Sequence, residues 1–276
     1  MTHLTNLVEF PALGLSFPLN RVAFSIGGIN IYWYGVCIAV GMCLALVFAF
    51  RHGVEFGVDA DAMVDVILIG VVMGILCARL YYVAMAPYNY DSLWEVLAIR
   101  DGGLAIYGGI IGGGITLLVV AKVKKIPSAV LLDLAGMGVI IGQCIGRWGN
   151  FVNGEAHGGP TTLPWGMTID GQSMVHPTFL YESLWNLAGF VLLHFYSKKR
   201  RFKGEIALLY AAWYGAGRAW IEGLRTDSLY IGSVRVSQLL AIISCIAAIA
   251  VLARQYHRIK VAKAFYVPET DENKGE

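Results

Sequence analysis

The sequence has few charged residues for its length. Only 14% of its 276 residues are Asp, Glu, Lys or Arg, and 57% are hydrophobic. A soluble domain carries about 25% charged residues. We therefore expect a membrane protein. The net charge of +2 is too small to favour a nucleic-acid partner, and none is expected.

Several chemical motifs are also missing. The five cysteines lie in apolar runs and form no CxxC pair, so we expect small buried side chains and no disulfide framework. The chain has no HExxH, GxSxG or GxxxxGK motif, which excludes the common zinc proteases, serine hydrolases and P-loop enzymes. Glu155, His157 and His176 lack the tight spacing of a metal site. No metal and no organic cofactor is expected.

What the sequence does contain is a series of long apolar segments. A helix needs about 20 residues to cross the hydrocarbon core, and helices are favoured because lipid cannot satisfy unpaired backbone groups. We expect an all-α membrane protein with a bundle of about seven transmembrane helices in one domain, residues 1–264, followed by a polar tail at 265–276. The expected spans are about 30–50, 62–86, 104–121, 128–146, 178–196, 205–222 and 235–253.

The positive charges orient this expected bundle. Thirteen lysines and arginines fall on one set of connections between the spans and five on the other set. Because positive charge marks the cytoplasmic side, we expect the N-terminus outside and the C-terminus inside. The outer connections then form a small extracytoplasmic head. It includes a hairpin expected at 22–33 around Gly27-Gly28 and a long connection at 147–177.

Glycines recur in the stretch "YGGIIGGGITLL" at 107–118. Gly108 with Gly112, and Gly109 with Gly113, are GxxxG pairs in an apolar run. Such pairs let two membrane helices approach closely, so we interpret them as packing positions.

The polar stretch "GRWGNFVNGEAHGG" at 146–159 directly follows an apolar span. Arg147 can grip a phosphate with two parallel hydrogen bonds. Asn150 and Asn153 add neutral donors and acceptors, and Glu155 can orient an arginine or accept from a hydroxyl. Gly158 allows close approach of the backbone. At the outer end of a span, this stretch predicts a site for an anionic lipid headgroup.

A second polar group falls in the sixth apolar segment. Tyr214, Arg218 and Glu222 are spaced four residues apart, which places them along one face of a helix. An internal Arg218–Glu222 pair that serves only the bundle is one interpretation. The other is that Arg218 and Arg147, at one depth, bind a phosphate together. Other charges expected in the outer half are Arg79, Glu182, Arg225 and Asp227, whereas Asp65 and Asp133, toward the inner ends, are expected to be caps or structural partners.

The stretch "HPTFLYES" at 176–183 leads into the fifth segment. His176 is a candidate acid, base or headgroup contact, and the alternative is a capping or loop histidine. Thr178 is a candidate cap of the helix.

These motifs together resemble the prolipoprotein diacylglyceryl transferases of bacteria. The stretch at 146–159 is similar to that family's pattern G-R-x-G-N-F-x-N-x-E-x-x-G throughout. Further similar stretches are "YWYG" at 32–35, "CARLYYV" at 77–83, "RDGGLAIYGG" at 100–109 and "HPTFLYES" at 176–183. The resemblance covers roughly residues 20–253.

The resemblance implies a reaction and a site. The diacylglyceryl group of phosphatidylglycerol would pass to the lipobox cysteine thiol of a preprolipoprotein signal peptide, releasing glycerol-1-phosphate. The protein would be a multi-pass protein of the bacterial cytoplasmic (inner) membrane, in contact with the lipid bilayer. Catalytic roles would fall to Arg147, Arg218 and Tyr107, and substrate binding to Arg147, Asn150, Asn153, Glu155, Gly158, Tyr34, His176, Tyr214, Glu222 and Arg225.

Two positions depart from the family pattern. Some members carry a histidine, proposed as a base, where this chain has Tyr107, and many carry a glutamine where it has Phe179. The first departure argues against a histidine base shared by all members.

A membrane lipid-binding or transport protein with an outer-leaflet anionic headgroup site is the alternative function. A transporter would show an internal repeat and charges near the midplane of the bilayer. The sequence has no evident repeat, and its polar residues gather toward one end of the spans. A purely structural membrane protein would give no reason for the arginines.

Overall fold

The computed structural model describes residues 5–86, 90, 92–99 and 102–265. The expected polar tail from 266 onward, and Arg100 and Asp101 of the "RDGGLAIYGG" motif, lie outside these described residues. The fold has two compact units. The first unit consists of Met1–Ile38, Gln143–Lys198 and Leu208–Glu276, and the second of Ala39–Gly142 and Lys199–Ala207.

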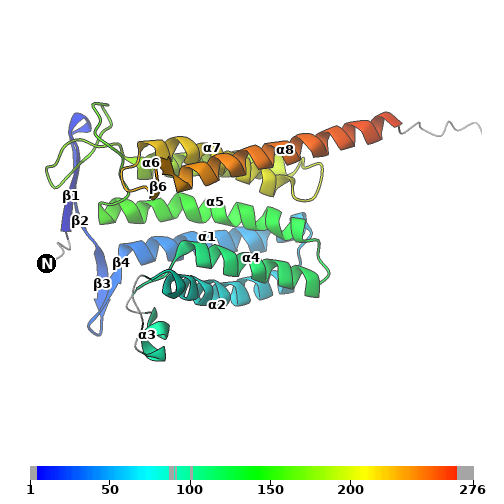
Figure 1. Cartoon of the computed structure of the whole chain (residues 1–276), viewed down its shortest axis with the longest axis horizontal. Coiled ribbons are helices and arrows are strands. Elements are labelled where there is room, and N and C mark those ends of the chain that lie inside the picture. The colour runs from blue at the N-terminus through cyan, green and yellow to red at the C-terminus, as the bar shows by residue number, and fades with distance from the viewer. Residues whose placement is uncertain (1–4, 87–89, 91, 100–101, 266–276) are drawn as a thin grey trace, which may run out of the picture. The chain divides into compact units, whose positions relative to one another are not determined.

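Each of the seven apolar segments is helical. Five of the described helices are long and apolar enough to cross a membrane, which supports an all-α membrane-spanning region. Polar residues lower the hydropathy of the other two, α6 and α7. The bounds are α1 Trp33–Phe56, α2 Ala60–Met85, α4 Ile106–Val123, α5 Ser128–Asn153, α6 Thr178–Ser197, α7 Glu205–Leu224 and α8 Val236–Phe265 (Figure 1).

The helices extend beyond the expected apolar spans. The α5 helix continues through the polar signature to Asn153, seven residues past the expected end of the span at 146, and the connection to α6 begins at Gly154. Hydropathy marks where apolar sequence ends, whereas a helix continues as long as its backbone hydrogen bonds do. A short helix, α3 Leu93–Leu97, lies in a connection for which no helix was predicted.

The connections between the helices contain more β-structure than the one hairpin that was expected. A three-stranded antiparallel sheet of the first unit has the order β2-β1-β5, with β1 at Thr5–Phe10, β2 at Leu15–Asn20 and β5 at Thr168–Ile169. A 3-10 turn, η1 Pro11–Leu13, joins the first two strands. Alternate residues of β1 are buried, as one side of a strand should be. Val8 and Phe10 form a core with Met167, Val175 and Phe179.

Two antiparallel hairpins complete the strands of the first unit. The hairpin expected at 22–33 is confirmed, with β3 Val22–Ile26 paired to β4 Ile29–Tyr32. Gly27 and Gly28 have φ of +56° and +83°, the backbone region that a two-residue type I′ turn requires at both positions. The second hairpin pairs β6 Tyr230–Ile231 with β7 Val234–Arg235.

The helices of the first unit are locked by close contacts. Trp185 of α6 and Trp213 of α7 stack at 4.5 Å, and each indole N–H donates to the other's carbonyl at 2.9 Å. A Cβ on Gly217 would overlap the Trp185 ring, and one on Gly215 would lie 2.7 Å from the Ala241 carbonyl of α8. Figure 1 shows α6, α7 and α8 running alongside one another. These contacts fix the register between α6 and α7.

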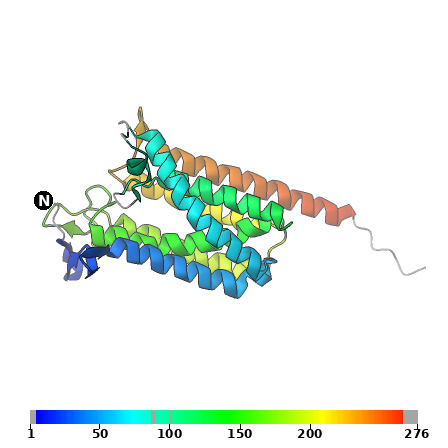
Figure 2. The same ribbon diagram turned by 90° about the horizontal axis from the view of Figure 1, so that it is seen from below.

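In the second unit, α4 packs closely against α2. A Cβ on Gly108 would overlap the Cys77 carbonyl, and one on Gly112 would lie 2.6 Å from the Met73 carbonyl (Figure 2). The Gly108/Gly112 pair is therefore a packing position, as predicted. In the other predicted pair, a Cβ on Gly113 would meet no described atom within 4 Å.

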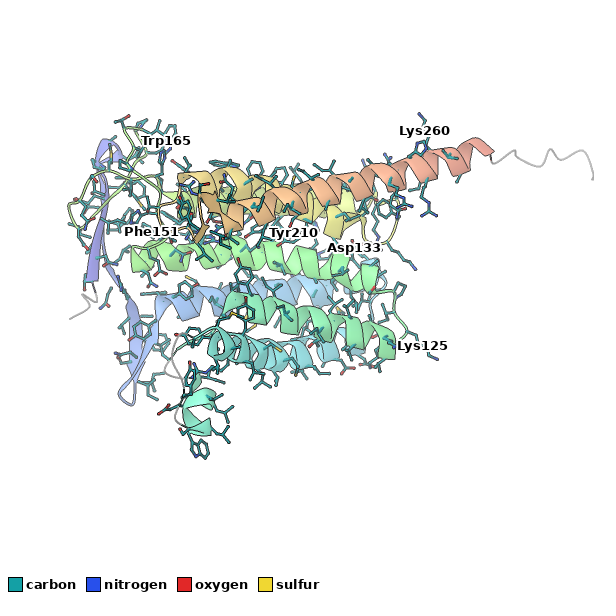
Figure 3. All side chains as sticks on the ribbon, viewed as in Figure 1. Lys125, Asp133, Phe151, Trp165, Tyr210 and Lys260 are labelled. Atoms are coloured by element: carbon teal, nitrogen blue, oxygen red, sulfur yellow. The ribbon has the colours of Figure 1, made fainter. Side chains whose placement is uncertain are left out.

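Asp65 and Asp133, the two carboxylates expected to be structural partners, do have such partners. Asp133 accepts from the backbone N–H groups of Gly204 and Ala207, both at 2.8 Å, and so caps the start of α7. Figure 3 shows Asp133 at the end of α5 beside that turn. Asp65 forms an ion pair with Lys124 at 2.7 Å.

Arg79 also has a structural partner set. The buried guanidinium donates to the carbonyls of Glu95 at 2.6 Å, Val96 at 2.7 Å and Gly102 at 2.8 Å. It therefore holds α3 and the following loop against α2. Arg79 was grouped with the charges expected in the outer half, but its bonds here are to backbone carbonyls.

Candidate active site

A single carboxylate bridges the two predicted arginines. Glu182 on α6 accepts from Arg147 Nη2 of α5 on Oε1 at 2.6 Å, and from Arg218 Nη1 of α7 on Oε2 at 2.9 Å. The Glu182 side chain is 3% exposed, against 21% for Arg147 and 14% for Arg218. Arginines that lie 71 residues apart in the sequence thus share one buried counterion.

The i,i+4 pair expected on the sixth segment is also present. Arg218 Nη2 lies 2.5 Å from Glu222 Oε2 in an ion pair whose geometry is not that of a hydrogen bond. Arg225 Nε lies 4.0 Å from the same oxygen. Arg225 pairs more closely with Asp227 through two hydrogen bonds of 2.8 and 2.6 Å. These hydrogen bonds lower the pKa of Asp227 below its usual range.

The asparagines and Glu155 extend the network from Arg147. Arg147 Nη1 donates to Asn150 Oδ1 at 3.2 Å, and the amides of Asn150 and Asn153 both donate to Glu155 Oε1 at 3.1 Å. Arg21 Nη2 donates to the carbonyl of Asn153 at 2.9 Å. The signature residues therefore form one connected polar group at the end of α5. Figure 3 shows Phe151 at the same end of that helix.

Gly158 lies where the polar loop passes between the ends of two helices. Its N–H donates to the His176 carbonyl at 2.9 Å, and it forms an antiparallel bridge with Arg225. An added Cβ would lie 2.6 Å from the His176 Cβ and 3.0 Å from the Leu224 carbonyl. Only glycine fits this position. Thr178 fixes the same loop by donating to the Ala156 carbonyl at 2.5 Å.

The two predicted site tyrosines of the first unit lie near this network. Tyr34 packs on Gly149 of the signature, where an added Cβ would lie 2.7 Å from its ring. Tyr214 lies one turn from Arg218 on α7 and stacks on Tyr210 with the ring centroids 5.9 Å apart.

His176 has partners of its own. Its Nδ1 lies 3.3 Å from the hydroxyl of Tyr181, which also accepts from Trp165 Nε1 at 2.8 Å. The Tyr181 ring stacks on Trp220. Among the described residues, His176 forms no hydrogen bond with Arg147 or Arg218, and its contacts fit the loop-histidine interpretation.

Tyr107 belongs to the second unit. It lies on α4, 41% exposed, with its ring 6.3 Å from that of Tyr81. The geometry of the arginine cluster therefore rests entirely on residues of the first unit.

Sequence reasoning grouped Glu182 with the charges expected in the outer half but did not include it among the site residues. An acidic residue in the apolar "HPTFLYES" segment was the available signal. Its bridging role depends on partners on two other helices, which spacing along the chain does not reveal.

The cysteines are less buried than expected. Cys144 is buried, with Sγ 3.5 Å from the hydroxyl of Ser183, but Cys37, Cys77 and Cys245 are only partly buried and Cys43 is exposed. The prediction that all five are buried was wrong, because helices of this kind also present apolar residues on their outer faces.

The arrangement is suited to hold a phosphate. Arg147 engages two of its five N–H groups in the hydrogen bonds above, and Arg218 engages one in a hydrogen bond and a second nitrogen in an ion pair, so each retains donors for a ligand. Glu182 and Glu222 balance the two positive charges before a ligand arrives. The site can therefore bind an anion without an unpaired buried charge in the free protein.

Comparison with known proteins agrees with these features. A family model for prolipoprotein diacylglyceryl transferase matches residues 21–254. The chain belongs to this family. That range contains the whole arginine cluster of the first unit.

Relatives in this family match most of the chain. A phosphatidylglycerol–prolipoprotein diacylglyceryl transferase from Clostridioides difficile (strain 630) is 42% identical over 232 residues, 84% of this chain and 93% of the relative. Proteins of the same name from Finegoldia magna (strain ATCC 29328 / DSM 20472 / WAL 2508) and Geobacillus kaustophilus (strain HTA426) are 46% and 45% identical. Each of these two alignments covers 84% of this chain; they cover 94% of the Finegoldia protein and 91% of the Geobacillus protein.

Proposed function

We propose that this protein transfers the diacylglyceryl group of phosphatidylglycerol to a cysteine thiol of a prolipoprotein. The observation that carries the proposal is the pair of arginines, Arg147 and Arg218, held on one buried carboxylate in a chain of the transferase family. An anionic phospholipid supplies the phosphate that such a pair recognises.

The reaction is a substitution at carbon. The cysteine sulfur bonds to the glyceryl carbon that carries the phosphate, and the bond from that carbon to the phosphate oxygen breaks. The products are a thioether and glycerol-1-phosphate, and the thiol proton balances the new phosphate monoester. The thiolate is the attacking form, and because free cysteine has a pKa of about 8.5, the thiol must give up its proton in the reaction. No metal or organic cofactor takes part in the proposed reaction.

The arginines act on the leaving group. Negative charge grows on the phosphate as the carbon–oxygen bond breaks, and donors already held in place stabilise that charge most in the transition state. Glu182 holds the two guanidinium groups in place before the substrate binds, so little free energy is needed to reorganise them during the reaction. Planar forks fit phosphate oxygens in a way that a lysine ammonium does not.

The neighbouring residues bind and shape the substrate. We assign Asn150, Asn153 and Glu155 to orienting Arg147, and Glu222 and Arg225 to orienting Arg218. In this proposal, four further residues around the arginines contact the substrate: Tyr34, Gly158, His176 and Tyr214. A role for Tyr107 in the transfer rests on the family resemblance alone.

The proposal includes a place in the membrane. All seven long helices cross the cytoplasmic (inner) membrane of a bacterium, with the N-terminus outside and the C-terminus inside. The charge asymmetry along the sequence supports this orientation. The site then faces the outer leaflet, where both the phospholipid headgroup and the lipobox of an exported signal peptide are found.

A single assay tests the transfer. Purified protein is incubated with phosphatidylglycerol and a lipobox peptide in detergent micelles, and the peptide is examined by mass spectrometry. We expect the mass of one diacylglyceryl group on the cysteine of the peptide, and none on a peptide with serine in its place. Binding of the lipid without an adduct would instead favour the lipid-binding or transport function.

A further inference from the structure

A second polar layer lies one helical turn from the arginine cluster. It consists of Gln143 on α5, Asn186 on α6 and Tyr214 on α7. Each is four residues from a member of the cluster on its own helix, namely Arg147, Glu182 and Arg218 in that order. Residues four apart share a helix face at a separation of about 6 Å along the axis.

The three residues of the layer lie at one level. Because α6 and α7 pair Glu182 with Arg218 and run antiparallel, four residues along each helix bring Asn186 opposite Tyr214. The same step on α5 and α6, from the Arg147–Glu182 pair, brings Gln143 opposite Asn186.

A further contact supports this alignment. Ser183 of α6 donates to the Cys144 carbonyl of α5 at 2.9 Å; Cys144 is next to Gln143, and Ser183 is three residues from Asn186 on its own helix. The layer thus spans the same three helices as the cluster.

The layer contains polar atoms that need partners. Asn186 is 0% exposed, and neither its Oδ1 nor its Nδ2 has a hydrogen-bond partner among the described residues. The Oε1 of Gln143 is also buried without one. Native proteins leave few such buried groups unpaired, which makes two amides at one level an indication of a polar ligand.

Space for a ligand lies beside the layer on α5. Gly146 is three residues from Gln143 and shares its helix face, and a Cβ added there would meet no described atom within 4 Å. Gln143 itself is only partly buried. A small group can therefore lie along α5 beside the Gln143 amide.

We propose that Gln143 and Asn186 bind the hydroxyl groups of a polyol phospholipid headgroup and select it over headgroups without hydroxyls. This inference rests on the proposed function. The unpaired atoms are two acceptors and one donor, which match a diol that donates twice and accepts once. The two hydroxyls of a glycerol headgroup are four and five bonds from the phosphorus, a reach that suits one helical turn. Sites that hydrogen-bond a substrate hydroxyl reject analogues that lack it.

Internal competition between two donor lipids tests the selection. Phosphatidylglycerol and phosphatidylpropanol, which has no headgroup hydroxyl, are given different acyl masses and mixed with the wild-type protein and a lipobox peptide. The ratio of the two peptide adducts gives the ratio of kcat/KM. We expect the wild type to favour phosphatidylglycerol at least about tenfold. Asn186→Leu and Gln143→Met should each move that ratio toward one.

The controls separate this inference from the proposed function. Leu187→Ala changes an exposed neighbour on α6 and should keep the wild-type ratio. Exchanging the acyl chains between the two lipids should leave the ratio unchanged. Equal use of both lipids by the wild type would overturn the inference, as would a wild-type ratio in both active variants. If Asn186→Leu does not fold, the Gln143→Met ratio decides alone. Absence of any adduct from either lipid in the wild type would instead refute the proposed transfer.

Discussion

Replacing Glu182 with glutamine tests how the site is held together. The substitution keeps the shape of the side chain but removes the charge that two arginines share at 2.6 and 2.9 Å. Removing one partner of a buried ion pair costs about 3–5 kcal/mol, because the remaining charge has no counterion. Arg147 is 21% exposed, so water screens part of its charge, and we expect a loss of about 3 kcal/mol in the free energy of unfolding.

The effect on catalysis should differ from the effect on binding. Without Glu182 the arginines repel each other and leave their positions, so kcat should fall by about 10²-fold. The site also gains net positive charge, so attraction to the anionic lipid strengthens and KM for phosphatidylglycerol should not rise. Arg218→Ala removes a phosphate contact and should raise KM as well as lower kcat.

The assay is the yield of peptide adduct over a range of lipid concentrations, with thermal unfolding measured in the same detergent. Glu182→Asp serves as the matched control, because it keeps the charge on a side chain one methylene shorter and should fall between wild type and Glu182→Gln. A Glu182→Gln protein with wild-type kcat would refute the reasoning that this carboxylate positions the arginines.

Four further predictions follow from the site and the topology. Arg147→Lys keeps the charge but loses the planar fork, so most activity should be lost in the adduct assay while the protein still inserts, and wild-type turnover would contradict this. A variant without its five cysteines should keep substantial activity, because direct attack by the peptide thiol needs no enzyme nucleophile; a diacylglyceryl adduct trapped on an enzyme cysteine would show otherwise. In that background, a cysteine at exposed Ser173 should react with an impermeant thiol reagent in intact cells, and one at exposed Lys199 should not; the reverse pattern would invert the topology. Asp227 has a lowered pKa in the fold, so its stabilising effect is present above its unfolded pKa and is lost as pH falls through the folded value. Because its side chain is 48% exposed, Asp227→Asn should lower stability at pH 7 by less than about 1 kcal/mol, and thermal unfolding at low pH should show no difference from wild type.

Local sequence patterns predicted the local parts of the fold. Apolar length located the helices, the spacing of Arg218 and Glu222 predicted their ion pair, and Gly27-Gly28 predicted a hairpin. Each of these depends on residues close together in the chain. Such patterns need no knowledge of how distant segments meet.

Features that depend on distant segments could not be obtained in this way. Glu182 meets arginines 35 and 36 residues away on two other helices. The β1 strand pairs with a two-residue strand near Ile169, too short to show an alternating pattern. Hydropathy could not locate the end of the α5 helix, because hydropathy falls at Arg147 while the helix continues to Asn153.

The pairing of β1 with β5 has a consequence for the order of events during synthesis. Val8 lies opposite Ile169, so roughly 160 residues are made between the two strands. At about 5–20 residues per second, that takes roughly 8–32 s. During this interval Val8 and Phe10 lack Met167 and Val175, the core residues that later cover them. The head is therefore among the last parts of this protein to be completed, and its first strand is exposed to chaperones and proteases for that time.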